Sequence, residues 1–126
     1  MQYLSFDNVK EIFLRTTGVS DDDFEHSQLL ENAEDFVLSH LSVSYDELTR
    51  VQVSLCEYAA AAVAVYDYSF ELYLRQQAVM SESGEVTLTR ADKYQLEASG
   101  RMRSNALKQL YCAEIAEPKD FAFIKI

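Results

Sequence analysis

One stretch decides the fold: residues 46–77 read DELTRVQVSLCEYAAAAVAVYDYSFELYLRQQ. It holds neither Gly nor Pro, so nothing in it interrupts a helix, and its 32 residues would span about 48 Å. Residues 58–66 are apolar throughout, which means that other helices or other subunits should enclose this part on every side. The stretch therefore predicts a long central helix against which the rest of the chain packs.

Helix-start signals divide the rest of the chain. At four places a serine or threonine is followed three residues later by a residue with a carboxylate or amide side chain. The four pairs are Ser5 and Asn8, Ser20 and Asp23, Ser44 and Glu47, and Thr89 and Asp92. The hydroxyl can accept a free backbone N–H of the first turn, and Ser44 with Glu47 matches the capping box. These signals predict four helices, at residues 6–17, 21–41, 46–77 and 92–116, the first ending at Gly18 and the last before Pro118.

Residues 78–89, AVMSESGEVTLT, differ from the helical segments around them. Val86 and Leu88 alternate with polar residues, and Ser-Glu-Ser-Gly supplies turn residues, so a small β-hairpin is predicted here. The predicted fold class is all-α: a single domain over residues 1–126 with four helices, one of them long and central, and a β-hairpin between helices 3 and 4. An apolar tail, residues 118–126, follows.

The composition is that of an acidic globular domain. The 126 residues are 48% apolar, and 11 Lys and Arg oppose 21 Asp and Glu, for a net charge of -10. This balance disfavours binding to nucleic-acid phosphates or anionic membranes. Residues 1–50 hold 3 basic and 11 acidic groups (net -8), whereas residues 51–126 hold 8 and 10 (net -2). The acidic end of one subunit could thus meet the fourth helix of the next.

The cysteines and the N-terminus indicate a cytoplasmic protein. Cys56 and Cys112 lie in helical apolar contexts, without metal-ligand spacing, and are interpreted as reduced thiols. The first ten residues lack the pattern of a secretory signal. The apolar run at residues 58–66 is much shorter than the roughly 20 residues that a membrane span requires.

Acidic and histidine residues provide the candidates for chemistry. Asp21, Asp22, Asp23, Glu25 and His26 are adjacent in sequence, but consecutive helical residues point about 100° apart and do not converge on one ion. An acidic helix N-terminus explains them better. His40 is expected to be a partly buried helix residue. No hydrolase or phosphate-loop motif is present. We therefore predict no catalytic, cofactor-binding or metal-binding residues, and no enzymatic activity.

The small and apolar segments leave alternatives open. The alanines of residues 59–64 permit close packing, either within one domain or between subunits. The hairpin is either a connector or a strand that pairs with another chain. The apolar tail either folds back on its own domain or docks on a partner.

The order of these parts resembles the head–tail connector (head-completion adaptor) proteins of tailed bacteriophages. The resemblance rests on Tyr58-Ala59-Ala60-Ala61-Ala62 through Tyr73, on the Ser81–Thr89 motif SESGEVTLT, and on the amphipathic residues 91–113. It covers about the last two-thirds of the chain. Residues 6–41 agree with the family only in being short paired helices.

The resemblance implies a non-enzymatic virion protein, assembled in the bacterial cytoplasm. Members of the family form a ring between the portal and the stopper or tail, complete the head, and extend a channel through which DNA only passes. On this basis the subunit interface is expected at Ala59, Ala62, Tyr66, Glu82, Val86 and Leu88, and the portal contact at Phe121, Phe123, Ile124 and Ile126. No cofactor or membrane is implied.

A different class of function also fits the charge. A net charge of -10 on a chain of this size is typical of small acidic inhibitors that bind a basic, DNA-binding host protein. The uneven distribution of the acids argues against duplex mimicry, which would need acids spaced along a whole surface.

Overall fold

The computed structural model describes residues 5–21, 27–83 and 90–116. Within these ranges the chain is helical, with four α-helices and a short 3₁₀ helix, η2. Their bounds are α1 (Phe6–Thr17), α2 (Ser27–Ser39), η2 (Tyr45–Glu47), α3 (Arg50–Ser83) and α4 (Arg90–Cys112). The prediction of an all-α fold is confirmed for this part of the chain.

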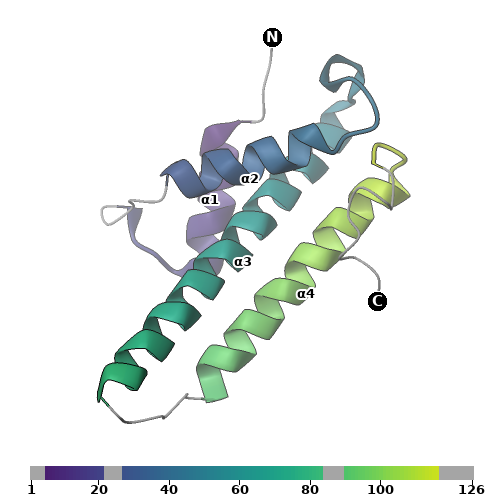
Figure 1. Cartoon of the computed structure of the whole chain (residues 1–126). Helices are drawn as coiled ribbons and strands as arrows, with labels where there is room; N and C mark the ends of the chain where they lie inside the picture. The colour runs from purple at the N-terminus through teal and green to yellow at the C-terminus, as the bar shows by residue number, and fades with distance from the viewer. Residues whose placement is uncertain (1–4, 22–26, 84–89, 117–126) are drawn as a thin grey trace.

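The long helix α3 is the centre of the molecule and contacts each of the other α-helices. Figure 1 shows α4 running alongside α3, whereas α1 and α2 pack against the half of α3 that follows η2. The other half of α3, toward Ser83, has only α4 beside it in Figure 1. The two ends of the long helix pair are therefore covered to different extents.

Helix α1 begins and ends where the sequence signals place it. The Ser5 hydroxyl accepts a hydrogen bond from the Asn8 backbone N–H (3.4 Å), and Gly18 ends the helix with a φ of 76°. The Gly18 N–H donates to the Leu14 carbonyl at 2.9 Å. Helix α2 ends at Ser39. Its predicted cap pairs Ser20 with Asp23, and Asp23 lies outside the described ranges.

The start of α3 differs from the prediction. Ser44 precedes only the short helix η2 and makes no side-chain cap hydrogen bond. The capping box forms instead between Thr49 and Gln52: the Gln52 N–H donates to the Thr49 hydroxyl (3.2 Å), and the Thr49 N–H donates to Gln52 Oε1 (2.9 Å). Leu48 has an extended conformation, with a φ of -73° and a ψ of 138°, so the backbone leaves the helical region before α3 begins.

The predicted hairpin at residues 78–89 is not supported. Residues 78–83 belong to α3, which is 34 residues long and continues past the predicted end at residue 77. Residues 84–89, including Val86 and Leu88, lie outside the described ranges, and the rest of the described chain holds no strand. Helix α3 is already 27 residues long at Gln76. Each further residue adds one backbone hydrogen bond without the cost of starting a new helix, which favours continuation through residues 78–83.

Helix α4 ends at Cys112, earlier than predicted, and Pro118 does not terminate it. The Ile115 N–H donates to the Leu110 carbonyl (3.2 Å) and the Glu114 N–H to the Tyr111 carbonyl (2.9 Å), the two bonds of a Schellman motif. Glu114 occupies the left-handed position with a φ of 63°. Beyond it, the Ser42 N–H donates to the Ile115 carbonyl (2.8 Å), which ties the end of α4 to the segment after α2.

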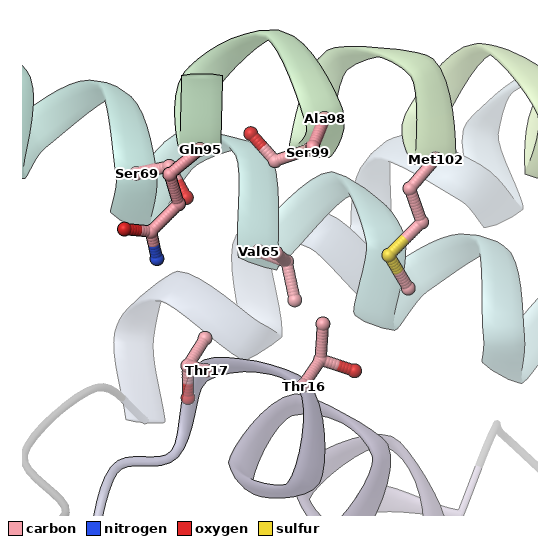
Figure 2. Close-up of a pocket in the computed structure, with 8 residues that line it drawn as sticks. All are labelled: Thr16, Thr17, Val65, Ser69, Gln95, Ala98, Ser99 and Met102. Atoms are coloured by element: carbon pink, nitrogen blue, oxygen red, sulfur yellow. The ribbon is translucent and has the colours of Figure 1, made fainter. Parts of the chain in front are cut away.

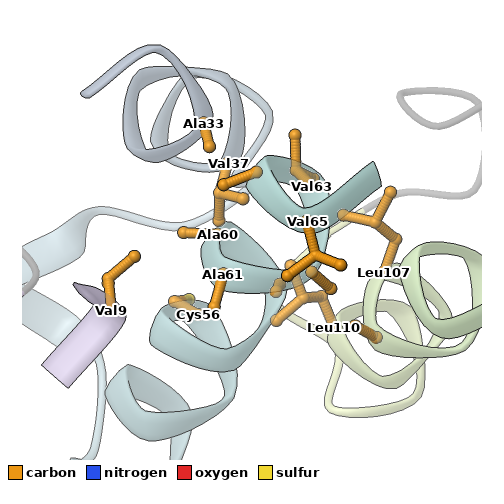
Figure 3. Packing of buried hydrophobic residues seen from close by; sticks show 14 of the residues in the cluster. Val9, Ala33, Val37, Cys56, Ala60, Ala61, Val63, Val65, Leu107 and Leu110 are labelled. Carbon is orange, nitrogen blue, oxygen red and sulfur yellow. The ribbon is translucent and has the colours of Figure 1, made fainter. Parts of the chain in front are cut away.

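A single hydrophobic cluster joins the four α-helices around the alanine-rich part of α3 (Figure 3). Ala59, Ala60, Ala61, Ala62 and Ala64 are all 0% exposed. Figure 3 places the α2 residues Ala33 and Val37, the α1 residue Val9, and the α4 residues Leu107 and Leu110 on different sides of this part of the helix. The prediction that residues 58–66 are enclosed on every side is confirmed within one chain for residues 59–65, whereas Tyr58 is 38% exposed and Tyr66 is partly buried.

Two glycines should respond to alanine in opposite ways. Gly18→Ala should lower the free energy of unfolding by about 1 kcal/mol, because an L-residue is disfavoured at a φ of 76°. Gly100→Ala, inside α4, should raise it by about 0.5 kcal/mol, since alanine favours helix and its Cβ would meet the Tyr66 ring at an ordinary 3.4 Å. Urea unfolding of both variants measures these changes. Two changes of the same sign would contradict the prediction.

Candidate assembly surface

The structure describes only some of the acidic and histidine residues considered as candidates for chemistry. Asp21 makes an ion pair with Lys10 at 2.8 Å, and Asp22, Asp23, Glu25 and His26 lie outside the described ranges. Among the residues that are described, no three His, Cys, Asp or Glu side chains are placed to hold a metal ion. His40 is partly buried, as predicted, but it lies in the turn just after α2 and not within a helix; its Nδ1 lies 2.7 Å from the Phe36 carbonyl oxygen.

Glu57 is a buried carboxylate that the sequence analysis did not single out. Although only 7% exposed, it accepts hydrogen bonds from the Ser5 backbone N–H (2.8 Å) and from Asn8 Nδ2 (3.3 Å). A carboxylate at the first turn of α1 also interacts favourably with the positive end of that helix. Glu57 thus anchors the beginning of α1 to α3. The sequence did contain a signal for this role: Glu57 directly precedes the apolar residues 58–66, and a charged side chain buried beside them needs hydrogen-bond partners.

Burial also sets the chemistry of Cys56, which lies beside Glu57 in α3. The side chain is 0% exposed, and burial, aided by the Glu57 carboxylate, raises the pKa of its thiol to about 12. A thiol with so high a pKa is protonated at neutral pH and is a poor nucleophile. Both cysteines are free thiols, but only Cys56 has the buried, apolar setting that was predicted for both, because Cys112 is exposed.

The raised thiol pKa should make stability fall at alkaline pH. In the unfolded chain the Cys56 thiol ionises near its ordinary pKa of 9.0, whereas in the folded chain its pKa is about 12 and it keeps the proton at lower pH. Between these values the folded state binds more protons, so the free energy of unfolding decreases as pH rises. Urea unfolding between pH 8 and 10.5 should show a shallower decrease for Cys56→Ala than for the wild type. Cys112→Ala should keep the wild-type slope; equal slopes in all three would refute the assignment.

Arg103 of α4 connects three helices. Its guanidinium lies 5.6 Å from the ring centroid of Phe36 on α2 and 5.2 Å from that of Tyr66 on α3. Burial raises the pKa of the nearby Asp67 carboxyl, and the positive charge of Arg103 counteracts that shift. Cation–π contacts of this kind contribute about 0.5–2 kcal/mol each, depending on how far they are removed from water.

Beyond this contact the long helices leave large apolar side chains in solvent. The Tyr66 and Phe70 rings stack with centroids 6.2 Å apart, and the i+4 spacing continues to Leu74. Phe70 is 41% exposed, Leu74 50%, and Tyr94, near the start of α4, 67%. We call Phe70, Leu74 and Tyr94 the distal surface. Phe70 and Leu74 lie in the part of α3 toward Ser83, and Tyr94 lies in the first turns of α4.

The predicted interface residues fall into different settings. Ala59 and Ala62 are 0% exposed, so packing within one chain accounts for them without a second subunit. Tyr66 is partly buried between Phe70 and Arg103. Glu82 lies in α3, while Val86, Leu88 and the predicted portal contacts (Phe121, Phe123, Ile124 and Ile126) lie outside the described residues. The distal surface was missed because its exposure depends on which helices cover α3.

Comparison with protein families, curated proteins and solved structures found no match for this chain. Within residues 5–21, 27–83 and 90–116, no helix is both long and apolar enough to cross a membrane. The interpretation of the function therefore depends on the chain's own sequence and geometry.

Proposed function

We propose that this protein is a structural component of a tailed-phage particle, which forms a homo-oligomeric ring between the portal and the stopper or tail. In this role it completes the head and extends the channel through which DNA passes. The observation that carries the proposal is the distal surface, where Phe70, Leu74 and Tyr94 expose between 41% and 67% of their area on the paired ends of α3 and α4. Phe70 and Leu74 lie one turn apart on α3, and large apolar side chains that are exposed close to one another are typical of protein–protein interfaces.

Two further features support this role. The charge is divided between acidic residues 1–50 (net -8) and nearly balanced residues 51–126 (net -2), which suits contact between the unlike ends of neighbouring subunits. A head-to-tail contact of this kind closes into a ring when its rotation permits. The resemblance of residues 58–73, 81–89 and 91–113 to head–tail connectors supplies the specific assembly and its partners, the portal and the stopper.

Deletion of the gene from the parent phage tests the proposal as a whole. Negative-stain images of the lysate should show free tails beside tail-less heads, many of them empty, because a head without a connector can neither retain its DNA nor join a tail. Infectious particles of normal appearance would refute the proposal. Co-purification of the protein with a basic, DNA-binding host protein would then favour the acidic inhibitor.

The distal surface itself can be tested with a matched pair of variants. Leu74→Glu should reduce ring formation on purified portal complexes about tenfold or more, because a charge would be buried in an apolar contact. Val51→Glu makes the same kind of change at the other end of α3, where Val51 is 70% exposed, and should assemble like the wild type. The measurement is the fraction of portal particles that carry a ring, counted by electron microscopy. Equal losses in the two variants would contradict an interface at the distal surface.

A further inference from the structure

A cavity lies where the end of α1 meets α3 and α4 (Figure 2). It has a volume of about 190 Å³, and the residues that line it are Thr16, Thr17, Val65, Ser69, Gln95, Ala98, Ser99 and Met102. None of these side chains carries a charge. An apolar cavity of about 150 Å³ is large enough to hold benzene, so this one has room for a single ring-sized molecule.

The hydroxyl groups around the cavity differ in how their protons are used. Thr16 Oγ1 donates to the Ile12 carbonyl, and Thr17 Oγ1 donates to the Phe13 carbonyl, both at 2.8 Å. Ser99 Oγ donates to the Leu96 carbonyl, also at 2.8 Å. These three oxygens have lone pairs left and can accept a hydrogen bond, but they have no proton to donate to a ligand.

Ser69 is the exception among the lining hydroxyls. The residue is 95% buried, and its Oγ has no hydrogen-bond partner among the described residues. Figure 2 shows the Ser69 and Gln95 side chains together on one side of the cavity, with Thr17 across from them. A buried hydroxyl without a partner costs about 1–3 kcal/mol, so a ligand that satisfies Ser69 gains a corresponding advantage.

We propose that this cavity is a binding site for a small, uncharged aromatic alcohol of about the size of phenol. The ring packs against the apolar walls formed by Val65, Ala98 and the Met102 thioether, a group that makes favourable contacts with aromatic rings. The ligand hydroxyl accepts a hydrogen bond from the Ser69 hydroxyl and donates one to the oxygen of Thr16, Thr17 or Ser99.

The site differs from the assembly surface in position and in chemistry. The Ser69 oxygen is shielded from water in the free protein, so binding as proposed requires a neighbouring side chain, such as the exposed Gln95, to move aside for the ligand hydroxyl. An ionised ligand is excluded, because no lining residue carries the opposite charge. This inference does not rest on the proposed function, and the two can fail separately.

Titration of the full-length protein with phenol tests the proposal, with NMR signals of the Met102 and Val65 methyl groups as reporters. Phenol should shift these signals in a saturable manner, toluene should bind about fivefold more weakly, and benzoate should cause no shift. Toluene has the same ring without the hydroxyl, so the comparison isolates the hydrogen bond. Benzoate tests the exclusion of charge. A lack of saturable shifts with phenol, which would mean that water alone fills the cavity, would overturn the proposal.

Variants of α3 assign the hydrogen bond to one residue. Ser69→Ala should weaken phenol binding about fivefold and leave toluene binding unchanged, because only the hydroxyl partner is removed. Ser54→Ala, an exposed serine of the same helix, is the matched control and should bind both probes like the wild type. Ala98→Leu fills the cavity and should abolish both interactions. Unchanged phenol affinity in Ser69→Ala, or phenol binding retained in Ala98→Leu, would overturn the assignment.

Discussion

Phe13→Ala should lower the free energy of unfolding by about 3–5 kcal/mol, the largest effect expected of any substitution considered for this protein. Phe13 is 0% exposed, and its ring packs edge-on against Tyr68 with centroids 5.5 Å apart. It holds α1 against α3, so its removal leaves a cavity at a contact between elements far apart in sequence. Chemical unfolding in urea, followed by circular dichroism, measures the change.

Phe70→Ala is the matched control for this prediction. It removes the same ring from a site that is 41% exposed on α3, and the isolated chain should lose less than about 1 kcal/mol. A loss of similar size in both variants would mean that burial in the single chain does not distinguish the two phenylalanines. Since a folded domain is commonly stable by about 5–15 kcal/mol, the Phe13 variant should remain folded but be clearly weakened.

Ala61→Leu should destabilise the protein by about 1–3 kcal/mol or more, although leucine is nearly as good a helix former as alanine. Ala61 is 0% exposed, and so are Ala60 and Ala62 on either side of it. A larger side chain has no solvent-facing direction in which to extend, so it must push the neighbouring helices apart. Thermal and urea unfolding together report this effect.

The control for overpacking is a change of the same kind on the exposed side of the same helix. Ser54→Leu enlarges an exposed residue of α3 and should change the free energy of unfolding by no more than about 0.5 kcal/mol. If Ala61→Leu were equally mild, the alanine-rich part would be loosely packed in the free chain. Its enclosure would then come from other subunits.

Local signals were sufficient for some elements and misleading for others. The start and end of α1 follow from Ser5, Asn8 and Gly18, because a cap needs only residues within one turn. Two caps compete for the start of α3, at Ser44 and at Thr49, and both match the capping pattern in sequence. The structure uses Thr49, a choice that local rules alone do not make.

The end of α4 could not be predicted for a related reason. Glu114 occupies a left-handed position that usually belongs to glycine, so its residue type gives no warning of the helix end. The cost of that conformation is offset by tertiary contacts: Ile115 is 2% exposed, and Leu41 and Ala116 form an antiparallel bridge. The candidate sites depend on tertiary structure in the same way. The sequence contains Leu74 and Ser69 but does not show that one is exposed and the other buried.

By itself, the sequence determined the class of this protein: an acidic, all-α chain organised around one long helix with an enclosed alanine-rich centre. Periodicity, capping residues and the absence of Gly and Pro from residues 46–77 influence only the local backbone, so they can be interpreted without knowledge of the fold. Only the tertiary structure decided that α1 and α2 cover one half of α3 and leave Phe70 and Leu74 in solvent. It also decided that Glu57 anchors α1, and that Ser69 lines a cavity while its buried hydroxyl has no partner among the described residues. Burial depends on which elements meet across long sequence separations, and no local pattern encodes that.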